Sequence, residues 1–239
     1  NLRCDSWANP QGIDVLRPVL SWTIQTKSAE RNVHQTAYQV LVASSSEKLQ
    51  ANDADIWNSG KVKSDQTSQI NYAGKPLLSG KTYWWKVKIW DAKGKESDWS
   101  EPANWTMGIL AAKDWKAQWI TAAGAEKYAH EYKSNKSDFN LRRNLSEFRA
   151  FAPKPTDPNF SSLLLRKEFS SAPSLKRAVV HVSGLGQYEL FINGTKTSDY
   201  LLAPGWSYYP KTVLYDTYDV TNQIKTGANA IGLILGNSI

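Results

Sequence analysis

Lys81-Thr-Tyr-Trp-Trp-Lys-Val-Lys-Ile-Trp90 alternates along its length between two sets of side chains. In an extended chain, one face carries Tyr83, Trp85, Val87 and Ile89, and the other carries Trp84, Lys86, Lys88 and Trp90. Alternation with a period of two predicts a β-strand whose first face is buried and whose second, amphipathic face is solvated. Asp91-Ala-Lys-Gly94 then predicts a hairpin turn, because glycine readily adopts a positive φ.

Segments of the same kind lie on both sides of this strand. Pro18–Ile24 and Ala37–Ala43 alternate well enough for half-buried strands, and residues 97–100 and 104–107 supply a partner strand after the turn. Roughly seven short strands separated by turns predict a β-sandwich over residues 1–108.

A second β pattern occupies the last third of the chain. Asn193-Gly194 is the strongest short hairpin signal in it. Asp219–Ile224 predicts a short helical turn that ends at Gly227. The strands that the alternation predicts are 163–169, 177–182, 187–192, 213–218 and 230–235.

The segment between the two patterns sets the domain organisation. Residues 109–118 are predicted to form a linker, and residues 119–239 a second domain. Residues 121–160 are polar, charged and poor in branched apolar side chains, so we expect an irregular insertion there. The chain is therefore predicted to be all-β, with two β-sandwich domains in series.

Composition limits the classes of function. Hydrophobic residues make up 41% of the 239 residues, which is enough for packed cores. The formal net charge is +7, but Lys and Arg are scattered singly or in pairs and form no concentrated basic patch. No apolar run approaches the roughly 18 residues that suggest a membrane span. We expect no nucleic-acid partner and no membrane span.

The single cysteine and the first residues bear on cellular location. Cys4 has no second cysteine with which to form an internal disulfide, and we expect it to be a small buried residue. No secretory leader is visible, and the chain opens on Asn1-Leu-Arg3 as it would after a leader had been removed. We expect a bacterial protein of the periplasm or the extracellular space.

Carboxylates are present without an arrangement that supports catalysis. Glycoside hydrolysis needs two of them about 5–10 Å apart across the bond. Asp199, Asp216, Asp219 and Glu189 qualify by residue type alone. We expect Asp219 to end a strand and cap the next turn, and Asp216 to lie on a solvated strand face. The chain by itself is predicted to be inactive.

Metal and nucleotide motifs are also missing from the sequence. The three histidines, His34, His130 and His181, are too dispersed for a metal-binding motif. Gly184-Leu-Gly186 lacks the third glycine of a dinucleotide-binding loop and lies between two predicted strands. We therefore expect no nucleotide cofactor.

Aromatic residues suggest a carbohydrate site. Trp206, Tyr208 and Tyr209 follow the turn-forming Pro204-Gly205, where exposed rings can stack on the apolar face of a sugar. Asn193 is a further candidate through its amide, although it is first a turn residue. The alternative is that Trp206 packs against its own sheet or the next domain.

The first domain carries motifs that resemble a known family. They run in the order Leu2-Arg-Cys4, Asn9-Pro-Gln-Gly-Ile-Asp14, Arg17-Pro-Val-Leu-Ser-Trp22, Gln35–Val42, Ile56-Trp-Asn-Ser-Gly-Lys-Val62 and Tyr83–Asp91. This set is similar to the leading domain of bacterial α-L-rhamnosidases. The resemblance implies a fibronectin type III-like or immunoglobulin-like sandwich.

The second domain strengthens the resemblance. Its motifs are Gly184–Gly194, Leu202-Ala-Pro-Gly-Trp206, Tyr215-Asp-Thr-Tyr-Asp-Val-Thr221, Gly227-Ala-Asn-Ala-Ile231 and Leu235-Gly-Asn237. They resemble the N-terminal jelly roll of the same enzymes, which is of the galactose-binding-like type. Some related jelly rolls bind rhamnose through calcium, which makes calcium a candidate cofactor and Asp199 its candidate ligand.

The resemblance also implies what the chain lacks. The catalytic carboxylates of the family lie on a large helical barrel further along the chain, and the strand pattern here leaves no room for one. We interpret the chain as the non-catalytic N-terminal part of an α-L-rhamnosidase, which is a glycoside hydrolase. The expected partners are the missing C-terminal catalytic domain and a carbohydrate, namely a rhamnose-containing glycan or glycoside. The alternatives are a stand-alone carbohydrate-binding or adhesion module, and a structural spacer.

Overall fold

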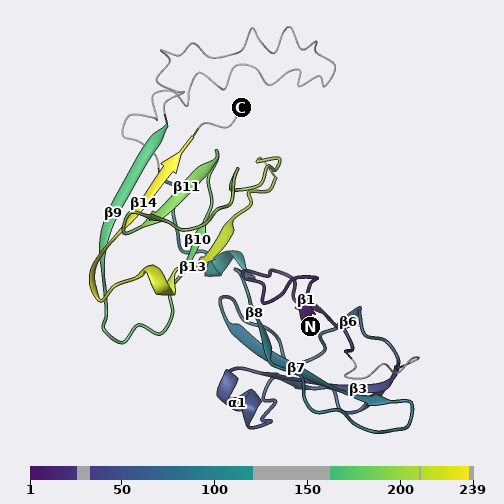
Figure 1. The fold of residues 1–239 in the computed structure, drawn as a ribbon. Coiled ribbons are helices and arrows are strands. Elements are labelled where there is room, and N and C mark those ends of the chain that lie inside the picture. The colour runs from purple at the N-terminus through teal and green to yellow at the C-terminus, as the bar shows by residue number, and fades with distance from the viewer. Residues whose placement is uncertain (26–32, 121–161, 210, 237–239) are drawn as a thin grey trace, which may run out of the picture. The chain divides into compact units, whose positions relative to one another are not determined.

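The computed structural model describes residues 1–25, 33–120, 162–209 and 211–236. The chain divides into two compact units, Asn1–Lys116 and Ala117–Ile239 (Figure 1). Within the described ranges the one α-helix is α1, Ser46–Gln50, and no helix is long and apolar enough to cross a membrane. The predicted all-β class, with two sandwich-type units in series, is confirmed. The predicted insertion at 121–160 and His130 lie outside the described residues.

The first unit contains two antiparallel sheets. The smaller has the order β1-β2-β6, with β1 at Leu2–Cys4, β2 at Val19–Trp22 and β6 at Ile70–Asn71. The larger has the order β4-β3-β7-β8, and β5 also pairs with β3. Its strands are β3 (Gln35–Ala43), β4 (Trp57–Asn58), β5 (Val62–Lys63), β7 (Thr82–Asp91) and β8 (Ala103–Thr106).

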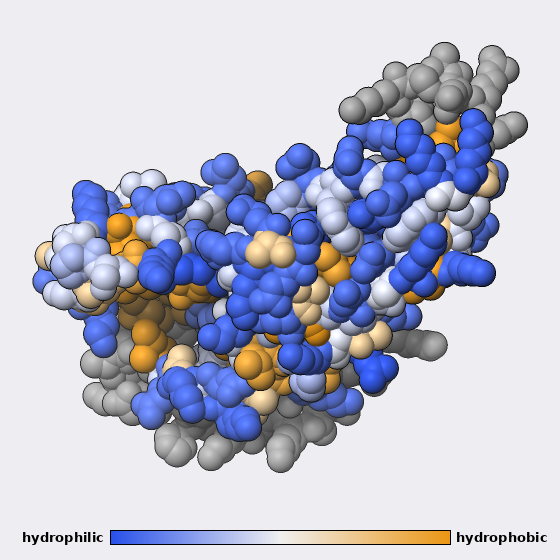
Figure 2. Space-filling view, turned by 90° about the horizontal axis from the view of Figure 1, so that it is seen from below, coloured by the Kyte–Doolittle hydropathy of each residue, from blue (hydrophilic) through white to orange (hydrophobic). Residues whose placement is uncertain are grey.

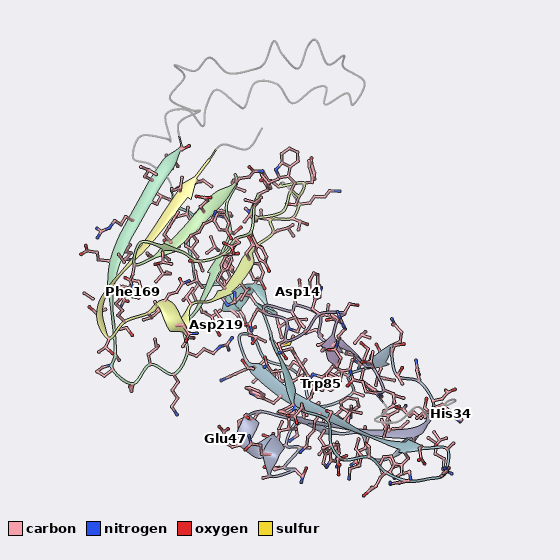
Figure 3. The ribbon with its side chains drawn as sticks, in the orientation of Figure 1. Asp14, His34, Glu47, Trp85, Phe169 and Asp219 are labelled. Atoms are coloured by element: carbon pink, nitrogen blue, oxygen red, sulfur yellow. The ribbon has the colours of Figure 1, made fainter. Side chains whose placement is uncertain are left out.

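The predicted buried face of β7 forms the centre of this core. Tyr83, Trp85 and Val87 are at most 5% exposed, and Figure 3 labels Trp85 within the first unit. Val40 and Val42 of β3 pair with Val87 and Trp85, so the same faces of the two strands meet in the core. The alternation in sequence therefore gave the correct orientation of the strand.

The second face of β7 is less solvated than the sequence predicts. Trp84 packs with Leu49 of helix α1, and Lys86 is only 8% exposed. The ammonium of Lys86 lies 5.1 Å from the ring centre of Trp99, and that of Lys88 lies 4.9 Å from it. Burial and the neighbouring Lys88 lower the pKa of Lys86. The expectation of a solvated face is wrong at Trp84 and Lys86, because the helix and an indole cover them.

Gln35 connects the two sheets at the start of β3. Its side chain is 1% exposed and accepts a hydrogen bond from the Trp22 indole at 3.0 Å. Its amide donates to the backbone carbonyls of Ser64 and Gln66 at 3.0 and 2.9 Å. A buried amide satisfied in this way fixes the loop after β5 relative to both sheets.

Cys4 lies in the core of the first unit. It is 1% exposed, as predicted for a small buried residue. Burial, with a smaller contribution from Asp5, raises the pKa of the Cys4 thiol well above its usual range. The thiolate form is therefore scarce at neutral pH.

The second unit has a four-stranded antiparallel sheet in the order β12-β11-β14-β9 and a two-stranded sheet of β10 and β13. The strands are β9 (Leu163–Ser171), β10 (Val179–Val182), β11 (Tyr188–Ile192), β12 (Thr195–Lys196), β13 (Asp216–Asp219) and β14 (Gly227–Leu235). Tyr188, Leu190 and Ile192 alternate into its core, where they meet Tyr218 and Val220.

The predicted turns of the second unit are present. Asn193 and Gly194, with φ of 52° and 81°, join β11 to β12, as in a type I′ hairpin. The helical turn predicted at Asp219–Ile224 is a single 3₁₀ turn, Thr221–Gln223. The strand predicted at 213–218 begins later, at Asp216.

Candidate functional site

An exposed apolar loop in the second unit contains the aromatic residues that the sequence singled out. It lies between β12 and β13, and its exposed side chains form what we call the apolar loop surface: Tyr200, Leu201, Leu202, Trp206 and Tyr208. Each is between 65% and 82% exposed. Figure 2 shows one face of the molecule, where hydrophobic residues in orange interrupt the hydrophilic surface in separate areas. So many large apolar side chains on one loop suggest a binding surface.

Local hydrogen bonds hold this loop in shape. The Ser207 hydroxyl donates to the Thr212 carbonyl at 2.6 Å, and the N–H of Thr212 donates to the Tyr208 carbonyl at 3.0 Å. Leu202 has a φ of 60°, in the left-handed region that bulky residues rarely adopt. Backbone strain of this kind persists where the surroundings impose it, often at functional sites. The loop therefore has a defined conformation that presents its apolar side chains outward.

The predicted sugar-binding residues differ in their exposure and in their hydrogen bonds. Trp206 and Tyr208 are 65% and 67% exposed, while Tyr209 is half-buried. Asn193 donates to the Gln223 carbonyl at 2.9 Å and to Oδ1 of Asn229 at 2.8 Å. Its own Oδ1 accepts the N–H of Ala230 at 2.9 Å. These bonds use the amide of Asn193 inside the hairpin, and its contact with a sugar stays a prediction.

Asp199 has surroundings poor in metal ligands. Its side chain is exposed. Across the described ranges, no group of three or more His, Cys, Asp or Glu side chains is placed to hold a metal ion. Calcium prefers six to eight oxygen ligands, usually with several carboxylates. The described residues do not supply such a carboxylate cluster, and calcium binding through Asp199 stays a prediction.

Two of the candidate catalytic carboxylates, Glu189 and Asp219, have partners on nearby residues. Glu189 is paired with Lys196 at 2.5 Å, and Asp219 accepts from the Thr221 hydroxyl at 2.6 Å. The N–H of Thr221 also donates to Asp219 at 3.0 Å. Asp219 ends strand β13 as predicted, but the N-cap of the following turn is Val220, without a side-chain capping bond. Each interaction occurs within the fold, and none of them points to chemistry on a substrate.

Asp216 departs from the expectation of a solvated strand face. It is half-buried, and its Oδ2 accepts the hydroxyl of Tyr188 at 2.7 Å. The Tyr188 hydroxyl also lies 3.2 Å from that of Tyr218. Burial, together with these two hydrogen-bond partners, raises the pKa of Tyr188 far above its usual range. The expectation was wrong because β13 faces the buried end of β11, so Asp216 serves as an internal acceptor.

His181 is expected to make the stability of the second unit depend on pH. Its Nδ1 lies 2.9 Å from the Thr217 hydroxyl, and burial followed by the charge of Arg177 lowers its pKa. The folded state thus binds the proton less readily than the unfolded state, whose histidine pKa is about 6.5. The stability that neutral His181 provides is present above that pH and is lost as pH falls toward the folded pKa.

We expect His181→Gln to reduce the loss of stability between about pH 7 and pH 5. Urea unfolding of both proteins across this range measures it. His34→Gln, which changes an exposed residue of the first unit, serves as the control and should leave the loss in the second unit unchanged. An identical pH dependence in wild type and His181→Gln would contradict the assignment.

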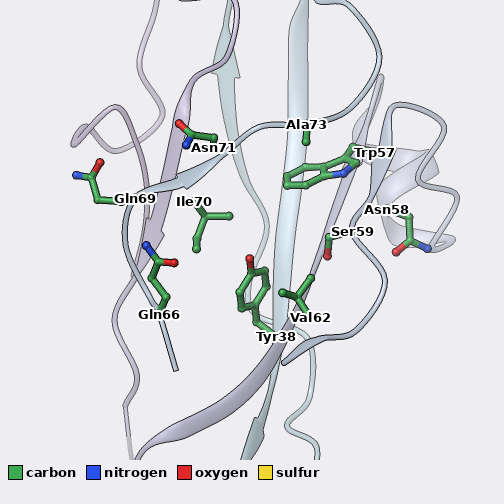
Figure 4. Close-up of a pocket in the computed structure, with 10 residues that line it drawn as sticks. All are labelled: Tyr38, Trp57, Asn58, Ser59, Val62, Gln66, Gln69, Ile70, Asn71 and Ala73. Atoms are coloured by element: carbon green, nitrogen blue, oxygen red, sulfur yellow. The ribbon is translucent and has the colours of Figure 1, made fainter. Parts of the chain in front are cut away.

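A cleft in the first unit was not predicted from the sequence. It has a volume of about 400 Å³ and opens between the two sheets, where β6 of the smaller sheet faces β3, β4 and β5 of the larger (Figure 4). Its lining residues are Tyr38, Trp57, Asn58, Ser59, Val62, Gln66, Gln69, Ile70, Asn71 and Ala73. The signal for it was the concentration of amide side chains in the short segments around 57–71.

Comparison with known proteins gives two family models that match. "Rha78A-like, N-terminal immunoglobulin domain" matches residues 1–111, and "Alpha-L-rhamnosidase N-terminal domain" matches residues 173–239. An α-L-rhamnosidase of Formosa agariphila is 37% identical over 235 residues, which are 96% of this chain and 23% of that protein.

Solved structures are similar as well. The α-L-rhamnosidase of Dictyoglumus thermophilum has a TM-score of 0.79 and 38% identity, covering 100% of this chain and 25% of that one. The enzyme of Aspergillus terreus has a TM-score of 0.71 over 98% of this chain and 23% of that one, and at 24% identity it supports the fold alone. The chain spans about a quarter of the length of these relatives.

Proposed function

Because this chain belongs to the α-L-rhamnosidase family and contains its N-terminal domains, we propose that it serves as the non-catalytic N-terminal part of a larger enzyme. That enzyme hydrolyses terminal α-L-rhamnosyl bonds, and the bond-breaking carboxylates belong to its remaining part. The two units hold that part in place and position the substrate. The observation that carries the proposal is the apolar loop surface, on a chain that spans a quarter of its relatives.

The composition of this surface favours protein packing. Leu201 and Leu202 are 82% and 69% exposed beside the aromatic residues. Aliphatic side chains gain free energy when they are removed from water, about 1.5–3 kcal/mol for a fully buried leucine. Leucine side chains gain little free energy from contact with a sugar, because the hydroxyl groups of the sugar require polar partners. The larger part of the enzyme is the occupant that this surface fits best.

We expect the 239-residue chain to bind the separately produced downstream part of the same enzyme. Leu201→Ser combined with Leu202→Ser should weaken that binding at least about tenfold, as measured by analytical ultracentrifugation. Leu164→Ser on β9, where the leucine is 77% exposed, is the matched control and should have no effect. A gene that ends at residue 239, or equal binding by all variants, would contradict the proposal.

Carbohydrate binding by the same loop is the second candidate function. The exposure of Trp206 and Tyr208 favours it, because rings on a fixed loop can stack on a pyranose. Calorimetric titration of the chain with L-rhamnose, with and without calcium, separates the two roles. A heat of binding that is lost in Trp206→Ala supports sugar binding by this loop. The absence of heat both with and without calcium removes Trp206 and Asp199 as ligand contacts.

A further inference from the structure

The cleft between the two sheets of the first unit contains a tyrosine hydroxyl that has no intramolecular partner among the described residues. Tyr38 is only 8% exposed, and its hydroxyl is directed into the cleft (Figure 4). In the described part of the chain, no hydrogen bond to this hydroxyl is formed. The fully buried side-chain polar atoms that lack a partner among the described residues are Asp5 Oδ2 and Trp85 Nε1, so the Tyr38 hydroxyl is accessible to solvent and can bond to a ligand that enters the cleft.

The other buried tyrosines show that this fold normally satisfies such groups. The Tyr72 hydroxyl donates to the Lys75 carbonyl at 2.5 Å, and the Tyr83 hydroxyl accepts the N–H of Leu78 at 2.9 Å. In the second unit, Tyr188 donates to Asp216 and lies 3.2 Å from the hydroxyl of Tyr218. Among the buried tyrosines that the structure describes, Tyr38 alone opens its hydroxyl toward a cleft without a protein partner.

Exposed carboxamides lie along one border of the same cleft (Figure 4). The side chains of Gln66, Gln69 and Asn71 line it, and within the described ranges they form no intramolecular hydrogen bond. Gln69 has a φ of 59°, in the left-handed region, which marks a locally strained backbone at the cleft wall. Gln35 fixes the neighbouring loop by its bond to the Gln66 carbonyl. The backbone of this border is therefore held in place at Gln66, and the exposed amide side chains are free to bond to a ligand.

An indole forms the opposite border. Trp57 of β4 is half-buried and packs edge-on against Tyr72, with 5.4 Å between ring centres. Gly74 approaches it so closely that an added Cβ would lie 2.5 Å from the Cβ of Trp57. The ring is thus held at the cleft, as Figure 4 shows.

The side chains that line the cleft indicate which class of ligand fits it. None of the lining residues carries a charge, which disfavours both anions and cations. Carboxamides, a phenol and an indole together donate and accept hydrogen bonds, and the rings supply apolar contact. The volume of about 400 Å³ lies in the usual range for small-molecule sites. We propose that this cleft binds a neutral saccharide, with the Tyr38 hydroxyl and the Asn71 and Gln69 amides contacting its hydroxyl groups.

The test uses the whole chain and measures binding of L-rhamnose, D-galactose, D-glucose, cellotetraose and xylotetraose by saturation-transfer NMR and calorimetry. Binding of at least one of them is expected. Tyr38→Phe and Asn71→Ala should each weaken it about tenfold. Trp7→Ala, which removes an exposed indole of the first unit outside the cleft lining, is the control and should leave it unchanged. Trp206→Ala is measured in parallel, because Trp206 belongs to the second candidate site.

The stability of Tyr38→Phe distinguishes a ligand contact made by the Tyr38 hydroxyl from a structural role of that hydroxyl. Because the Tyr38 hydroxyl has no partner in the described fold, Tyr38→Phe should leave the urea midpoint of the first unit unchanged or raise it. The proposal is overturned if none of the five saccharides binds, or if Tyr38→Phe lowers the midpoint without weakening binding. Binding that depends on Trp206 and not on Tyr38 also overturns it, while supporting the second candidate function of the apolar loop surface.

Discussion

Asn229→Ala is expected to lower the free energy of unfolding of the second unit by about 3 kcal/mol, because it leaves several buried polar groups unsatisfied. Asn229 is 4% exposed. Its Oδ1 accepts from the Asn193 amide and from the N–H of Lys225, both at 2.8 Å. Its amide donates to the carbonyls of Lys225 and Gly227 at 2.7 and 2.8 Å. One side chain thus joins the β11–β12 hairpin to the turn before β14.

Urea unfolding of the whole chain measures this loss. The transition of the second unit should move to lower urea, while that of the first unit stays in place, since the two cores are separate. Asn222→Ala is the matched control, because Asn222 is exposed and lies on the nearby 3₁₀ turn. An effect of Asn229→Ala no larger than that of the control would mean that the network does not stabilise the hairpin.

Trp105→Ala is expected to lower the free energy of unfolding of the first unit by about 4 kcal/mol, the usual cost of removing a large aromatic side chain from a core. Trp105 is fully buried on β8. Its ring centre lies 6.1 Å from that of Tyr72 and 5.7 Å from that of Tyr83. Its indole N–H also donates to the sulfur of Met107 at 3.2 Å. The cavity left behind lies between the two sheets.

The control for this substitution is Trp7→Ala, which removes an indole that is 71% exposed. Urea unfolding followed by near-ultraviolet circular dichroism should show a large shift for Trp105→Ala and little change for Trp7→Ala. Similar midpoints for both variants would show that the core tolerates the cavity, contrary to its packing in the structure.

Local patterns in the sequence predicted the elements that depend on neighbours along the chain. The period of two in β7 identified the face that enters the core, and Asn193-Gly194 identified the hairpin. Both follow from the geometry of one strand or one turn. The all-β class follows from repeating such elements, and the order of the family motifs pointed to the correct family.

Features that depend on packing between distant segments escaped prediction. The second face of β7 is covered because helix α1 and Trp99 pack over it, which the period of two cannot show. Asp216 is an acceptor for Tyr188 because β13 folds against β11. The cleft requires β6 to face β3 across two sheets, so Tyr38 and Asn71 come together only in the folded chain.

For the same reason, only part of the candidate site could be predicted from the sequence. The sequence located Trp206 and Tyr208 in a turn-rich segment, and both are exposed. It gave no sign that the amide of Asn193 would be used by Gln223 and Asn229, because these partners lie on other strands and turns. Their binding roles, and that of Asp199, stay predictions.

The burial of Cys4 makes this chain convenient for fluorescence work. It is the one thiol in the sequence, it is 1% exposed, and burial keeps it in the unreactive protonated form at neutral pH. A cysteine introduced at an exposed position will therefore be the site that maleimide dyes modify. A single probe can then be attached to either unit without removing the native thiol.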